Sequence, residues 1–192
     1  MVSRPLTSFT IEREIRSGEI AYLLVRPVSY MFHHCAAYLG ERVVRLVLNL
    51  AVSSVVVAAL TGRVALSPLG LLAYIPAVAL GMLVDFAGIF MVGAAAFWME
   101  DTAPVYWVYQ RASMLLGGML FPLDIFPLAA ARVLRYLPFS FVVYRPAELA
   151  VAFRPRVLAG ALAGEAGVCA AMMAVAWLVL VRGVRRLEAR AG

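Results

Sequence analysis

The sequence contains no lysine, and only 15% of its 192 residues are charged. All 17 basic residues are arginines, which excludes a P-loop lysine, a Schiff-base lysine and a lysine general base. Any nucleotide hydrolysis must therefore be performed by a partner. The two cysteines, Cys35 and Cys169, are far apart and form no CxxC pair. This spacing indicates neither a metal site nor a disulfide framework.

Apolar residues are abundant instead. They make up 64% of the chain, and the mean hydropathy is +0.90. Soluble domains are about half apolar and about a quarter charged, so this composition predicts an integral membrane protein and excludes a disordered chain. The chain has a net charge of +6. In a membrane protein such an excess of arginine is typical of loops that face an anionic leaflet, and it does not indicate nucleic-acid binding. The N-terminal residues are polar and include arginines, so we expect no cleavable signal peptide.

Four apolar runs are candidates for crossing a hydrocarbon core of about 30 Å, which takes about 20 helical residues. They are residues 43–61, 76–97, 104–121 and 157–181. We expect Pro76 to divide the second run from an interfacial stretch before it. The sequence thus predicts an all-α integral membrane protein with about four transmembrane helices. Residues 1–42 would form a cytoplasmic or interfacial segment, and residues 43–192 the transmembrane domain.

Arginine distribution predicts the orientation. Nine arginines precede residue 43 or follow residue 181, and fewer lie in the loops that would face outward. Because positive residues favour the cytoplasmic side, we expect both termini there, which an even number of spans allows. Between the last two spans, residues 122–156 contain five prolines, which break this stretch into pieces too short to cross a membrane.

The first forty residues contain a short apolar helix over residues 19–25. Gly18 separates it from a charged helical stretch, and Pro27 ends it. Ile20, Leu23 and Leu24 share one face at helical spacing. That face could rest on the lipid surface or dock into a partner protein, and the residues alone leave both alternatives open.

Two acidic residues fall inside predicted spans. Asp85 is near the middle of its span, where a carboxylate is costly unless it faces a cavity or has a partner. It could line a pathway for polar or cationic cargo, or form a structural pair, for example with Arg111. Glu165 lies in a run of small residues and is expected at a helix interface. Both are candidate translocation-pathway residues.

Motifs for catalysis or metal binding are absent from the sequence. His33 and His34 are adjacent and point to different helix faces, which is poor geometry for a metal site. No G-x-S-x-G, H-E-x-x-H or G-x-G-x-x-G string occurs. We therefore expect no catalytic residues, no metal and no cofactor bound by this chain.

Four strings in order resemble the permease subunits of type-2 ATP-binding-cassette exporters, specifically a prokaryotic branch of six-span permeases. They are IRSGEIAYLLVRPVS at 15–29, AFWMED at 96–101, GGMLFPLDIFP at 117–127 and LPFSFVVYRP at 137–146. The resemblance covers nearly the whole chain. It departs in one respect: two spans precede the cytoplasmic loop in such relatives, whereas this sequence begins at the loop.

The resemblance implies a coupling segment that docks on a separate ATPase subunit, which would bind ATP and Mg. Its predicted interface residues are Arg16, Gly18, Glu19, Ile20, Leu23, Leu24, Arg26 and Pro27. The resemblance also implies short re-entrant helices near the outer face. Their turn residues would be Gly117, Gly118, Pro122 and Pro127.

The function implied is that of a membrane-spanning permease of an ATP-driven exporter in the prokaryotic cytoplasmic membrane. A second permease copy or a paralogue would complete the transporter together with the ATPase subunits and the lipid bilayer. The alternative is a non-transporting membrane scaffold or a truncated orphan fragment of such a permease. The sequence does not identify the substrate.

Overall fold

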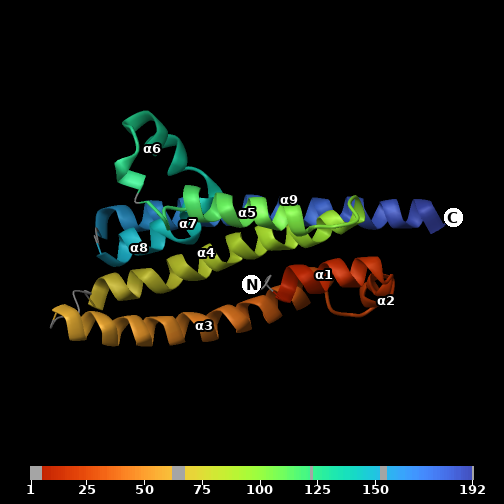
Figure 1. The fold of residues 1–192 in the computed structure, drawn as a ribbon, viewed down its shortest axis with the longest axis horizontal. Coiled ribbons are helices and arrows are strands. Elements are labelled where there is room, and N and C mark those ends of the chain that lie inside the picture. Colours follow the sequence, from red (N-terminus) through yellow and green to blue (C-terminus); the bar gives the residue numbers. More distant parts are fainter. Residues whose placement is uncertain (1–5, 62–67, 122, 152–154, 192) are drawn as a thin grey trace.

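The fold consists of long helices that run side by side, with shorter helices at both ends (Figure 1). The computed structural model describes residues 6–61, 68–121, 123–151 and 155–191, and all regular structure within them is helical. The long helices are α3 (Tyr30–Thr61), α4 (Pro68–Ala94) and α9 (Pro155–Ala191). Within them, Tyr30–Leu60, Leu72–Phe97 and Leu158–Ala189 are long and apolar enough to cross a membrane. The predicted all-α membrane fold is confirmed.

The run predicted as a third span forms a shorter helix. It corresponds to α5 (Ala103–Leu116), which has 14 residues and is therefore about 21 Å long. That length is less than a hydrocarbon core of about 30 Å. The described residues thus contain three helices of membrane-spanning length, and four crossings remain a prediction.

Two helices are longer than the apolar runs suggest. α3 begins at Tyr30, so the predicted boundary at residue 42 falls inside a continuous helix. α4 likewise continues through Pro76, where a break was expected. A proline removes one backbone hydrogen bond, and a spanning helix tolerates this loss where neighbouring groups satisfy the freed carbonyl.

The helix α4 forms the centre of the bundle. Half of its most apolar stretch is buried, whereas that of α3 is exposed. Phe86 and Phe90 of α4 are fully buried in a core that also includes Tyr38 of α3 and Leu180 of α9. The uniform hydrophobicity of α4 agrees with its position, because a helix surrounded by others has no face for water.

The N-terminal helix α1 (Leu6–Arg16) lies beside the C-terminal part of α4, and the next helix, α2 (Glu19–Leu24), contacts α1. There α1 contacts both α4 and the short helix η1 (Ala95–Phe97). Gly93 makes this contact possible, since a Cβ atom at this position would lie 2.9 Å from the Cβ atom of Ile11. The N-terminal segment is therefore packed on the bundle.

Four short helices connect α5 to α9: η2 (Leu123–Ile125), α6 (Leu128–Leu134), α7 (Pro138–Val142) and α8 (Tyr144–Val151). Of these, α7 and α8 pack against α4. They lie toward the end of the molecule opposite α2 (Figure 1). The proline-rich stretch is thus broken into short helices, as predicted.

Candidate functional site

Asp85 of α4 connects three helices through its carboxylate. Arg42 of α3 places Nη2 3.2 Å from Asp85 Oδ2, and the hydroxyl of Tyr38 donates a hydrogen bond to the same oxygen. The hydroxyl of Tyr109 on α5 donates to Asp85 Oδ1 at 2.9 Å. Both carboxylate oxygens therefore have partners, which offsets the cost of a charge among apolar helices.

The local sequence explains how these partners reach Asp85. Tyr38 and Arg42 are four residues apart and hence lie on one face of α3, where the guanidinium is 5.0 Å from the centre of the tyrosine ring. On α4, Gly88 leaves room for Tyr109. A Cβ atom at Gly88 would lie 2.3 Å from the Tyr109 hydroxyl oxygen. The contact between α4 and α5 thus depends on a residue without a side chain.

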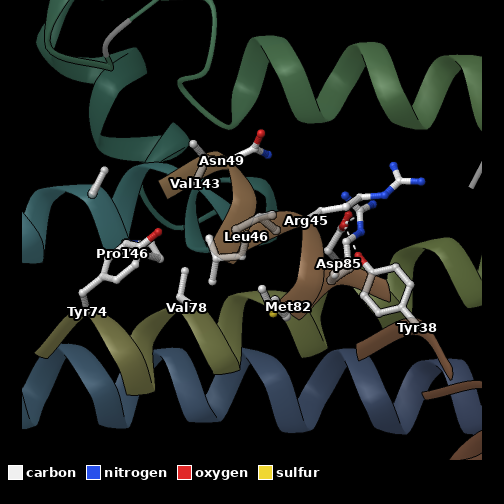
Figure 2. Close-up of a pocket in the computed structure, with 13 residues that line it drawn as sticks. Tyr38, Arg45, Leu46, Asn49, Tyr74, Val78, Met82, Asp85, Val143 and Pro146 are labelled. Atoms are coloured by element: carbon white, nitrogen blue, oxygen red, sulfur yellow. Dashed lines mark hydrogen bonds and ion pairs between the residues drawn. The ribbon is translucent and has the colours of Figure 1, made fainter. Parts of the chain in front are cut away.

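A cavity of about 310 Å³ opens beside this network, between α3, α4 and the α7–α8 region (Figure 2). Its polar lining residues are Tyr38, Arg42, Arg45, Asn49, Tyr74 and Asp85. Its apolar lining includes Leu46, Val78, Met82, Val142, Val143 and Pro146. A second cavity of about 300 Å³, next to α5, is also lined by Arg42 and Asp85. The ion pair therefore lies between two cavities.

Two buried carboxylates fix α1 to α3 and to the start of α5. Glu14 Oε2 accepts a hydrogen bond of 2.7 Å from the hydroxyl of Tyr30 and lies 2.9 Å from Nε2 of His34, both on α3. Glu12 Oε2 accepts a hydrogen bond of 2.7 Å from Oγ1 of Thr102, which immediately precedes α5. Polar residues of a charged helical stretch thus point into the protein.

The helix α2 has both a buried and an exposed face. Ile20 is completely buried in the core of the chain. In contrast, Tyr22 is 69% exposed and Val25 is 84% exposed. The guanidinium of Arg26 lies 5.3 Å from the centre of the Tyr22 ring. An apolar surface beside an arginine is therefore available at this end of the molecule.

Residues 3–191 match the ABC-2 family transporter proteins. The chain belongs to this family. It is a multi-pass membrane component of an ABC transporter, as predicted, and family membership implies association with an ATPase subunit. Neither a curated protein nor a solved structure matches the chain significantly.

Most of the predicted interface residues of this ABC-2 permease lie at exposed positions around α2. Gly18 adopts φ = 75°, a conformation that favours glycine, and separates α1 from α2 as predicted. Leu24 is 38% exposed, whereas Leu23 is half-buried. The other exposed members are Arg16, Glu19, Arg26 and Pro27. Ile20 packs inside the chain and is therefore not available to contact a partner.

Asp85 has a different partner from the one suggested by the sequence. Arg111 is exposed and lies 6.0 Å from the ring centre of Trp107, whereas Arg42 pairs with Asp85. Arg42 directly precedes the apolar run that starts at Val43, so the sequence predicts it outside the first span. The four-residue spacing of Tyr38 and Arg42, read as an extension of the helix, is the signal that could have identified them.

Glu165 is a buried residue of α9, away from the Asp85 network and outside the lining of both cavities. Its Oε1 has no hydrogen-bond partner among the described residues, and Arg145 of α8 acts on it electrostatically. The two predicted pathway carboxylates are therefore not brought together. Arg145 was not identified from the sequence, because no spacing rule relates α8 to α9.

The predicted turn residues lie around the end of α5. Gly117 caps this helix, and Gly118 follows with φ = 75°. Pro127 directly precedes α6 with an extended conformation. Pro122 lies outside the described residues. A re-entrant path through the membrane remains a prediction.

Proposed function

We propose that this chain is the permease of an ATP-driven exporter and that α1 and α2 transmit the movements of a separate ATPase subunit to the spans. The observation that carries the proposal is the contrast between these two helices. Buried carboxylates fix α1 to the bundle, whereas α2 exposes an apolar surface. A segment that transmits force needs a rigid attachment on one side and a docking surface on the other.

The attachment involves several helices. Glu14 connects α1 to α3, Glu12 connects it to the start of α5, and Ile11 packs against α4 at Gly93. A displacement of α1 therefore moves the ends of three helices together. ATP needs only to favour one of the resulting conformations to shift the permease between inward-facing and outward-facing states.

The proposed docking surface consists of Tyr22, Leu24 and Val25, with Pro27 beside them and a polar rim formed by Arg16, Glu19 and Arg26. Aromatic and arginine side chains are enriched at protein interfaces, and Tyr22 and Arg26 stack on each other here. Tyr22 and Val25 take the place of the buried Ile20.

The arrangement of the ends supports cytoplasmic termini. Residues around Leu24–Tyr30 and the last turns of α9, including Arg185 and Glu188, line one pocket and thus lie at the same end of the bundle. Arginines at this end favour the cytoplasmic side of a prokaryotic membrane. We further propose that two permease copies, or this chain and a paralogue, assemble with two ATPase subunits.

Affinity purification of the full chain from its native membranes in mild detergent tests the proposal. We expect an ATP-binding-cassette subunit with ATPase activity to co-purify. Tyr22→Ala should reduce its recovery, whereas Tyr136→Ala, which removes an equally exposed tyrosine near α6, should not. Failure to recover an ATPase would contradict the proposal. A bound ATPase whose hydrolysis never drives transport would favour the scaffold alternative.

A further inference from the structure

We propose that the cavity between α3, α4 and the α7–α8 region binds an amphipathic anion. Its carboxylate or phosphate head group would contact Arg45 and Arg42, and its apolar tail would lie along Leu46, Val78 and Met82. Binding itself depends only on the cavity. The role of this ligand as transported cargo rests on the proposed function.

The charges of the cavity favour an anion over a cation. Asp85, its acidic lining residue, already receives hydrogen bonds from Tyr38 and Tyr109 and pairs with Arg42. A cationic ligand would have to displace these partners. With two arginines against one aspartate, the lining carries a net charge of +1.

Arg45 is the guanidinium that an incoming anion can reach. Its side chain is 59% exposed, and its Nη2 is 2.6 Å from Oε1 of Glu41 one turn earlier on α3. The pair joins neighbouring turns of one helix, and neither side chain is fully buried. An anion can therefore replace Glu41 without disturbing the helix, and the planar guanidinium can bind it in bidentate fashion.

The lining of the cavity suits a ligand with one charged end. In Figure 2, Arg45 and Asp85 lie near one end with Tyr38, and Tyr74 and Pro146 lie near the other. Val78, Leu46 and Met82 lie between the two ends. Its volume of about 310 Å³ is at the lower end of the range typical for small-molecule sites. This separation of charged and apolar lining distinguishes the cavity from one suited to a uniformly polar solute.

A binding experiment with head-group analogues tests the inference. The purified full chain is reconstituted in neutral phosphatidylcholine nanodiscs and titrated with dansylaminoundecanoic acid, followed by its fluorescence. Analogues with the same tail carry a trimethylammonium or a neutral amide head group. We expect saturable binding of the carboxylate and at least about tenfold weaker binding of the other two.

Variants locate the site. Arg45→Gln should weaken carboxylate binding by roughly tenfold to a hundredfold, the loss typical of a charge-assisted hydrogen bond. Arg111→Gln, which removes an exposed arginine that does not line this cavity, should leave binding unchanged. Val78→Trp fills the apolar part and should weaken binding of all three probes. Thermal unfolding of each variant in detergent verifies that the fold is retained.

Adding phosphatidylglycerol to the nanodiscs distinguishes two sources of the anion. If this lipid displaces the probe from the unaltered chain, the occupant can come from the bilayer; if it does not, a free amphiphile is the ligand. Equal binding of the three head groups, preference for the cation, or unchanged binding by Arg45→Gln would overturn the inference. None of these results depends on an ATPase, so they are independent of the test of the proposed function.

Discussion

At the residue scale, Asp85 and Glu165 show that a carboxylate in a spanning helix can have very different surroundings. Asp85 has an arginine and two tyrosine hydroxyls on its two oxygens. Glu165 is more deeply buried, yet its Oε1 has no hydrogen-bond partner among the described residues. The sequence places both in apolar runs, so only their neighbours distinguish a stabilised pair from an unsatisfied group.

Replacing Asp85 should destabilise the bundle. Asp85→Asn leaves the Arg42 guanidinium without its counter-charge. We expect the free energy of unfolding to fall by about 1–3 kcal/mol, because both side chains of the pair are only partly buried. Thermal unfolding in detergent measures this effect.

The double variant Arg42→Gln/Asp85→Asn serves as the control. It removes both charges and should recover part of the stability lost by Asp85→Asn alone. An Asp85→Asn protein as stable as the unaltered chain would show that the ion pair contributes nothing to the fold.

At the scale of elements, small residues determine which helices meet. Gly88 is required where Tyr109 of α5 approaches α4, and Gly93 where α1 does. A helical glycine is otherwise unfavourable by about 1 kcal/mol relative to alanine. Its positions in α4 therefore mark the faces against which other helices pack.

The Gly88→Ala substitution should destabilise the contact between α4 and α5 by about 1–3 kcal/mol, because the new methyl group overlaps the Tyr109 hydroxyl. Gly40→Ala is the matched control, since nothing lies within 4 Å of a Cβ atom at that position of α3. It should be neutral or stabilising by up to about 1 kcal/mol. Thermal unfolding of both variants compares them, and equal effects would rule out a specific role of Gly88.

The docking surface at α2 gives a second prediction for an element. Leu24→Asp and Arg26→Glu should each weaken ATPase binding. For Leu24→Asp we expect a loss of roughly fourfold to twelvefold, which corresponds to half of the typical 1.5–3 kcal/mol for burying a leucine. Neither position lies in a span, so insertion should be unchanged. Recovery of the ATPase with each purified variant, at equal membrane levels, measures the effect.

Val133→Asp provides a control at an exposed apolar position of α6, where the side chain is more accessible than that of Leu24. It should bind the ATPase like the unaltered chain. Normal ATP-driven transport by both α2 variants would instead indicate that α2 rests on the lipid surface.

At the scale of the whole molecule, α4 is surrounded by neighbours, and α3 keeps its most apolar stretch exposed. The helices α2 and α6 lie toward opposite ends of the bundle (Figure 1). We therefore expect the loops next to α2 and those next to α6 to lie on opposite sides of the membrane.

Labelling of single introduced cysteines tests the orientation. Cys35 and Cys169 are buried, so the background with a membrane-impermeant maleimide should be low. We expect Ile125→Cys, at an exposed position, to react in intact cells. Val25→Cys should react only after permeabilisation, and the reverse pattern would contradict cytoplasmic termini.

The amino-acid sequence by itself determines the class of this protein. Its composition requires lipid around most of the chain, and its ordered motifs indicate the family that the comparison confirms. Gly18 and the proline-rich stretch likewise predict local breaks, because glycine and proline act through their own backbone geometry. Apolar runs are less informative about where helices end, since α3 continues through polar residues before Val43.

Only the tertiary structure decided which polar groups meet. Arg42, not Arg111, pairs with Asp85, and Ile20 points into the core although its spacing suits a docking face. The cavity beside Arg45 likewise arises from α3, α4 and the α7–α8 region, which are distant in sequence. Helical periodicity defines the faces of each helix but not the rotation of one helix against another, and that rotation determines which side chains come into contact.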